Sequence, residues 1–320
     1  MKRDDKPRRL LKGIHPIPTL VTLGNLLSGL GSIMLAMRAA YPPRNLNFDA
    51  DDCLYWAGML IFAAMIFDVM DGKVARWTKS TSKFGMEMDS LADVISFGVA
   101  PAILVKAMID QQLINGNPFP LMDRFLFPLL GTYTACAALR LARYNVEADT
   151  GHRDFFFGMP SPGAAGCVAS LVIFILPGGH HSPLPQLQDA STAVLIHLRQ
   201  SAYHPVMLAM PFLMMGWGVL MVTRVLYPHV GDRFLRGRKS FMHLIVLGLI
   251  LVLAVVQTEI VLVLAFNGYM LLGLLNEVRY QFVPSHRPKE WLQFGEEPAP
   301  PPAPAGQSAP QTPLKEPPVA

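Results

Sequence analysis

Long apolar runs separated by short polar segments dominate the chain. A helix needs about 20 apolar residues to cross the roughly 30 Å hydrocarbon core of a bilayer. Eight runs approach that length, and they cover residues 17–40, 54–70, 84–107, 122–142, 159–176, 205–226, 241–257 and 260–278. The second, fifth and seventh runs are short. The pattern predicts an all-α integral membrane protein with about eight transmembrane helices.

The composition excludes several other classes of protein. Hydrophobic residues make up 52% of the 320 positions and charged residues only 16%, against roughly 25% charged residues in an ordinary soluble domain. These fractions disfavour a soluble enzyme, a disordered chain and a nucleic-acid binder with a broad basic face. The three cysteines are too few for a disulfide framework or a zinc cluster. We expect membrane lipids as partners and no nucleic acid.

The distribution of positive charge predicts the orientation of the chain. Cytoplasmic loops of membrane proteins carry an excess of Lys and Arg. With the amino terminus inside, 22 of the 27 Lys and Arg residues fall in segments that face the same side. We therefore expect both termini in the cytoplasm. The first apolar run is too long for a cleavable signal peptide, and no small-residue cleavage site follows it.

Four aspartates interrupt the apolar pattern where the second run ends and the third begins. Asp68 and Asp71 are three residues apart, and Asp89 and Asp93 are four apart, so each pair shares one helix face. Charge at the edge of a membrane helix is costly and needs a reason. Taken singly, Asp68 or Asp71 could be an ordinary boundary residue. If the two helices are antiparallel neighbours, however, the four carboxylates converge near the cytoplasmic boundary.

Converging carboxylates predict a metal site. Like charges this close must be partly protonated or held by cations. Oxygen donors without His or Cys favour Mg²⁺, Mn²⁺ or Ca²⁺ over zinc, and two such ions could clamp a phosphate. The small residues Gly72, Ala75 and Gly85 would let a nucleotide approach the backbone closely. Arg76 would supply positive charge for phosphates.

Residues 68–93 read D-x2-D-G-x2-A-R-x8-G-x3-D-x3-D. This pattern resembles the signature of the CDP-alcohol phosphatidyltransferase family, with no departure at its eight fixed positions. The resemblance implies a six-helix membrane core around a polar cavity that faces the cytoplasm, often in a homodimer. It also implies transfer of a substituted phosphoryl group from a CDP-linked lipid to an alcohol, with release of CMP.

The resemblance assigns roles to these residues position by position. Asp68, Asp71 and Asp89 would bind two divalent cations, Mg²⁺ or Mn²⁺. Asp93 would face the same cations and act as general base on the incoming hydroxyl. Asn25 resembles a family position near the nucleotide, although a helix-packing amide is the alternative. The residues expected to line the CDP site are Asn25, Gly72, Ala75, Arg76 and Gly85.

Further segments resemble the phosphatidylserine synthase branch of that family, namely residues 89–101, 140–145 and 157–162. They imply CDP-diacylglycerol as the donor and L-serine as the acceptor. Arg140 and Arg143 share a helix face, and Arg suits a bidentate contact with the carboxylate of serine. Snorkelling at a helix end is the alternative for both. Asn145, which follows them, is a third candidate for the acceptor site.

The predicted organisation has four parts. They are a basic cytoplasmic segment (1–16), the membrane core (17–228), two additional transmembrane helices (229–280) and a Pro-rich cytoplasmic tail expected to be disordered (281–320).

Two alternatives to this function stay open. Within the family, the acceptor could instead be glycerol 3-phosphate, an inositol phosphate or choline, although the sequence has no clear additional cationic cluster or aromatic cage for them. In a different class, a cation transporter or a non-catalytic scaffold would also place Asp residues in the membrane. The Gly- and Arg-containing pattern at one membrane face argues against that second class.

Overall fold

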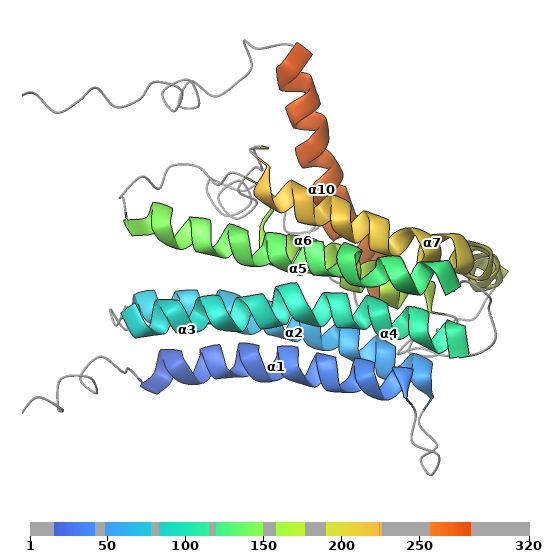
Figure 1. Cartoon of the computed structure of the whole chain (residues 1–320), viewed down its shortest axis with the longest axis horizontal. Helices are drawn as coiled ribbons and strands as arrows, with labels where there is room; N and C mark the ends of the chain where they lie inside the picture. The colour runs from blue at the N-terminus through green and yellow to red at the C-terminus, as the bar shows by residue number, and fades with distance from the viewer. Residues whose placement is uncertain are drawn as a thin grey trace, which may run out of the picture. The chain divides into compact units, whose positions relative to one another are not determined.

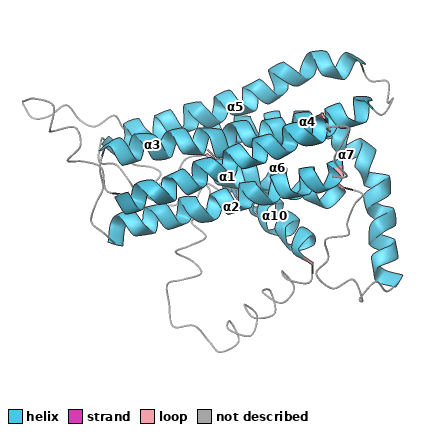
Figure 2. Ribbon diagram, turned by 90° about the horizontal axis from the view of Figure 1, so that it is seen from below, coloured by secondary structure: helices cyan, strands magenta, loops and turns pink. Residues whose placement is uncertain are grey.

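The computed structural model describes residues 16–41, 49–77, 83–114, 120–149, 158–176, 190–223, 225 and 257–282. These residues form helices joined by loops and include no strand (Figures 1 and 2). In chain order the helices are α1 (Pro16–Ala40), α2 (Ala50–Trp77), α3 (Lys83–Asp93), the π-helix η2 (Val94–Val99), α4 (Ala100–Ile114), α5 (Pro120–Asp149), α6 (Ser161–Ile175), α7 (Ala190–Val222) and α10 (Thr258–Phe282).

The chain is a multi-span membrane protein, and the predicted all-α class is confirmed. Within the described residues, six helical stretches are long and apolar enough to cross a bilayer. They are Pro18–Ala40, Ala50–Val74, Phe84–Gln111, Arg124–Val146, Tyr203–Val222 and Thr258–Arg279. The fifth predicted run corresponds to α6, which is apolar but only 15 residues long. The seventh predicted run, 241–257, lies almost wholly outside the described residues, as does the tail from 283 onward.

Helix α2 is longer than the apolar run that predicts it. It begins at Ala50, with Asp51 and Asp52 in its first turn, and it continues to Trp77. Acidic side chains stabilise the positive end of the helix dipole, and a count of apolar residues does not include them. Because α2 continues to Trp77, the segment from Asp68 to Arg76 is helical throughout, and its carboxylates are held on a regular helix.

The interior of residues 1–277, which form one compact unit, is built around the short helix α6. Helices α1, α2 and α4 pack against one another, α5 packs along α7, and α6 contacts both α2 and α7 (Figure 1). Small residues allow these close approaches. At Gly58 of α2, for example, an added Cβ would lie 2.8 Å from Cγ1 of Ile173.

The third span contains a π-helix that the hydropathy pattern does not predict. In η2 the N–H of Ala100 donates to the carbonyl of Ile95, five residues earlier. Side chains of α5 bind two carbonyl oxygens of this wider turn. The Tyr133 hydroxyl donates to Phe97 O (2.9 Å), and Thr134 Oγ1 donates to Gly98 O (3.1 Å). The turn begins directly after Asp93, and these two hydrogen bonds attach it to α5.

Candidate active site

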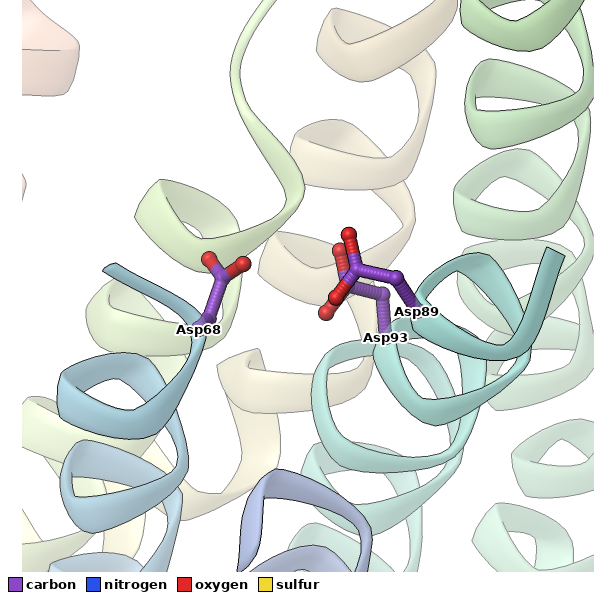
Figure 3. Close-up of side chains that lie close together, drawn as sticks. All are labelled: Asp68, Asp89 and Asp93. Atoms are coloured by element: carbon purple, nitrogen blue, oxygen red, sulfur yellow. The ribbon is translucent and has the colours of Figure 1, made fainter. Parts of the chain in front are cut away.

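Three of the predicted aspartates converge in space. Asp68 lies on the last part of α2, while Asp89 and Asp93 lie one turn apart on α3. Figure 3 shows the Asp68 carboxylate facing the other two across the space between the helices. One carboxylate oxygen from each of the three residues lies within 4.8 Å of the others. The structure thus brings together three of the four aspartates that the sequence predicts to converge.

The electrostatics of this cluster favour a bound cation. Asp93 is 8% exposed, and Asp89 Oδ1 is buried without a hydrogen-bond partner. Among the described side chains, no Lys or Arg forms an ion pair with these carboxylates. Repulsion between buried like charges is strong at low dielectric constant. Oxygen donors alone, with one left unsatisfied, are a donor set that fits a hard divalent cation.

Asp71 lies beside this cluster rather than in it. Its Oδ2 accepts a hydrogen bond from Thr22 Oγ1 on α1, and its side chain is 7% exposed. Thr22 is not among the site residues predicted from the sequence. Its position three residues before Asn25, on the same face of an apolar helix, is the signal that could have identified it.

Asn25 also faces the aspartates. Its Nδ2 donates to Asp93 Oδ1 at 2.9 Å, and its main-chain carbonyl accepts a hydrogen bond from Ser96 Oγ at 3.0 Å. The predicted position near the nucleotide is therefore a position in direct contact with the proposed base. Through this hydrogen bond Ser96 also belongs to the site.

Apart from Asn25 on α1, the residues expected to line the CDP site lie on the same two helix ends, of α2 and α3. Gly72 is exposed on α2, and a Cβ added there would meet nothing within 4 Å. Gly85 lies one turn before Asp89 on α3. Ala75 and Arg76 belong to the last turn of α2, but their side chains lie outside the described part of the chain. The backbone beside Gly72 is thus open to a ligand.

Two of the three predicted acceptor residues of α5, Arg140 and Asn145, contact neighbouring helices. Arg140 Nη1 donates to Ser161 Oγ at the start of α6 (2.9 Å), whereas Arg140 Nε is buried without a partner. Asn145 Nδ2 donates to Ser90 Oγ of α3 at 2.9 Å. Arg143 lies on α5 between these two contacts and is half-buried.

Arg140 is near the carboxylates without being paired to them. It interacts electrostatically with both Asp68 and Asp93, yet no ion pair within 4 Å joins it to either residue. A half-buried guanidinium near the carboxylates could hold a small anionic group next to the aspartates. The structure therefore places a cationic group near Asp68 and Asp93.

Comparison with known proteins identifies similar sequences. A family model described as CDP-alcohol phosphatidyltransferase matches residues 15–226. The CDP-diacylglycerol–serine O-phosphatidyltransferase of Helicobacter pylori is 37% identical over 158 residues, which is 49% of this chain and 60% of that protein. An enzyme of the same name from Mycobacterium leprae is 34% identical over 180 residues, 54% of this chain and 52% of that protein.

The similarity extends to an archaeal protein. The archaetidylserine synthase of Methanothermobacter thermautotrophicus is 34% identical over 217 residues, covering 67% of this chain and 70% of that protein. The chain thus spans about half to 60% of the length of the two bacterial relatives, and more of the archaeal one.

Proposed function

The chain belongs to the CDP-alcohol phosphatidyltransferase family, and on that basis we propose that it transfers the phosphatidyl group of CDP-diacylglycerol to the hydroxyl of L-serine. The products would be phosphatidylserine and CMP. The observation that carries this proposal is the convergence of Asp68, Asp89 and Asp93 within 4.8 Å. The names of the similar bacterial proteins support serine as the acceptor.

The aspartates would hold two divalent cations, Mg²⁺ or Mn²⁺. Asp68, Asp71 and Asp89 are the proposed ligands, and Asp93 faces the same position. When bound, such ions neutralise phosphate oxygens and stabilise the attacking and leaving oxygens of a displacement. The unpartnered Asp89 Oδ1 supports this assignment, because a buried acceptor without a donor is costly unless a ligand satisfies it.

Asp93 would act as the general base. A serine hydroxyl is a weak nucleophile, and a positioned carboxylate removes its proton as the oxygen attacks. The serine oxygen forms a bond to the phosphorus that carries the diacylglycerol group, and the bond from that phosphorus to the CMP oxygen breaks. The proton moves to Asp93, and CMP leaves with the electron pair.

Arg140 would bind the carboxylate of serine. Only one of its guanidinium nitrogens is used by Ser161, and its Nε is buried without a partner. A planar donor set of this kind suits a carboxylate. Arg143 and Asn145 are further candidates on the same helix. A phosphorylated acceptor or choline is the alternative, and its recognition would need other side chains.

The donor would occupy the ends of α2 and α3. Gly72, Ala75, Arg76 and Gly85 would line the CDP site, and Asn25 would lie at its border. By the positive-inside rule, the site and both termini would face the cytoplasm from an inner membrane. A homodimer is the proposed assembly.

The test is a CMP-release assay on the purified full chain. With CDP-diacylglycerol, Mn²⁺ or Mg²⁺ and L-serine, CMP should appear in proportion to phosphatidylserine, and chelation of the metal should stop it. A panel of glycerol 3-phosphate, inositol phosphate and choline serves as the control. Release with one of these acceptors and none with serine would refute serine as the acceptor. Absence of release with every acceptor would refute the activity itself.

A further inference from the structure

We propose that Asn25 is a positioning residue, which holds the carboxylate of Asp93 in the orientation that proton abstraction needs. This inference rests on the proposed function, because it presumes that Asp93 is the base. It differs from the role that the sequence resemblance implies for Asn25, which is contact with the nucleotide. Three features of the structure support it: the contact itself, an unsatisfied oxygen, and a close approach of two helices.

The contact joins two buried side chains from different helices. Asn25 on α1 is fully buried, and its Nδ2 lies 2.9 Å from Asp93 Oδ1 on α3. An ionised carboxylate only accepts hydrogen bonds, so the amide must present its NH₂ group to Asp93. This bond orients the carboxylate by holding Oδ1 of Asp93 towards α1, and we place the proton of the incoming hydroxyl on Oδ2.

The other end of the amide argues against a packing role. Asn25 Oδ1 is buried and has no hydrogen-bond partner. An unsatisfied buried acceptor destabilises the fold, whereas leucine would fill a similar volume without that penalty. An amide at this position therefore has a use other than packing, and the Asp93 contact is the use that the structure displays.

The backbone at Asn25 is fixed against the turn that follows Asp93. Ser96 Oγ donates to the Asn25 carbonyl at 3.0 Å. One turn further along α1, a Cβ on Gly29 would lie 2.3 Å from Ser96 Oγ and 2.8 Å from Ser96 Cα. Glycine at position 29 thus permits α1 and η2 to touch. Because of this contact, the amide approaches Asp93 from a backbone that cannot shift easily.

The orientation of the Asp93 carboxylate matters because Asp68 and Asp89 lie beside it and could hold a cation that attracts it. The Asp93 carboxylate lies within 4.8 Å of ligand oxygens of Asp68 and Asp89, so a cation at that cluster would attract both of its oxygens. The bond from Asn25 keeps one oxygen on the α1 side. Without it, the carboxylate could turn fully towards the cation, and the distance to the acceptor hydroxyl would increase. A base misplaced by about 1 Å can cost about 100-fold in rate.

The test compares Asn25→Leu with Asn267→Leu in the full chain, using CMP release from CDP-diacylglycerol and L-serine. Asn267 is a matched control, since it is also an amide on a membrane helix and donates to Ser170 Oγ (3.2 Å). We expect Asn25→Leu to lower kcat about 10- to 100-fold, the value of a hydrogen bond to a charged group. The KM for CDP-diacylglycerol should change less than about threefold. Asn267→Leu should leave kcat within about twofold of the wild-type value.

Other outcomes show which part of the proposal is wrong. A higher KM for CDP-diacylglycerol with unchanged kcat would make Asn25 a nucleotide contact and overturn the inference, as would wild-type kinetics of Asn25→Leu. If Asn25→Leu does not fold, Ser96→Ala gives the answer. It removes only the hydroxyl that fixes the Asn25 backbone, and it should lower kcat about 3- to 10-fold. An unchanged kcat in a folded Ser96→Ala protein would likewise overturn the proposal. If the wild-type chain uses another acceptor, the proposed serine specificity fails, and the same comparison is made with that acceptor.

Discussion

The carboxylates at the two ends of helix α2 have different surroundings. At its amino-terminal end, Asp51 accepts a hydrogen bond from Gln111 (3.2 Å), and the nearby α4 carries a Lys106–Asp110 ion pair. At its carboxyl-terminal end, Asp68 faces the carboxylates of α3, and no described Lys or Arg is paired with it. Neighbouring side chains thus satisfy Asp51 by a hydrogen bond and Asp110 by an ion pair. Carboxylates that face one another favour a bound cation, and this difference supports the second end as the proposed functional one.

The largest effect is expected at Asp93. Asp93→Asn keeps the shape of the side chain and the volume of the buried site but removes its capacity to take a proton. CMP release should fall about 10²- to 10⁴-fold, whereas Mn²⁺ binding, measured by calorimetry on the same protein, should largely persist. A variant that retains turnover would show that another group is the base.

The next largest effect is expected from removing a proposed metal ligand. Asp89→Asn should lower CMP release about 100-fold or more at a fixed Mn²⁺ concentration, and higher Mn²⁺ should restore part of the loss. The physical reason is that Asp89 supplies a buried oxygen without a protein partner. The matched control is Asp51→Asn at the other end of α2, which should leave the Mn²⁺ dependence unchanged. An equal change in both variants would remove the distinction between the two ends.

A smaller and more selective effect is expected at Arg140. Arg140→Lys keeps the positive charge but loses the planar donor set, so the KM for serine should rise about 10-fold or more. The KM for CDP-diacylglycerol should change little. Arg124→Lys, an exposed position on the same helix, is the control for a general effect on α5. Equal increases in both KM values would assign Arg140 to the lipid diphosphate instead of serine.

The smallest effect is expected at the locally paired end. Asp110→Asn breaks the Lys106–Asp110 ion pair, whose Lys side chain is 39% exposed. Exposed pairs of this spacing contribute about 0.3–0.5 kcal/mol to stability. The midpoint temperature of thermal unfolding of the detergent-solubilised protein should therefore hardly change. The kcat for CMP release should also stay within about twofold of wild type. A large loss of activity would connect this end to the site.

The sequence predicts much of this arrangement because hydropathy and helical spacing act locally. The apolar runs predict the helices, and spacings of three and four residues predict which carboxylates share a face. The resemblance to the CDP-alcohol phosphatidyltransferase family is confirmed by the match over residues 15–226. These inferences need no knowledge of tertiary contacts.

Contacts between helices could not be predicted in the same way. The π-turn of η2 depends on hydroxyls of Tyr133 and Thr134, which are more than 30 positions away in the chain. The pairing of Thr22 with Asp71 depends on how α1 packs against α2. The hydropathy pattern also predicts that α2 begins at residue 54, whereas the helix begins at Ala50. Hydropathy gives no weight to the acidic residues that stabilise a helix terminus.

The short helix α6 has a consequence for how two unlike substrates could reach one site. Fifteen residues of α-helix are about 22 Å long, which is less than the roughly 30 Å thickness of the hydrocarbon core. The helix begins at Ser161, whose hydroxyl accepts a hydrogen bond from Arg140. This polar pair therefore lies at the first residue of the apolar helix α6. A hydrophilic amino acid could therefore reach this polar pair from the membrane surface, while a diacyl lipid could diffuse in sideways from the leaflet.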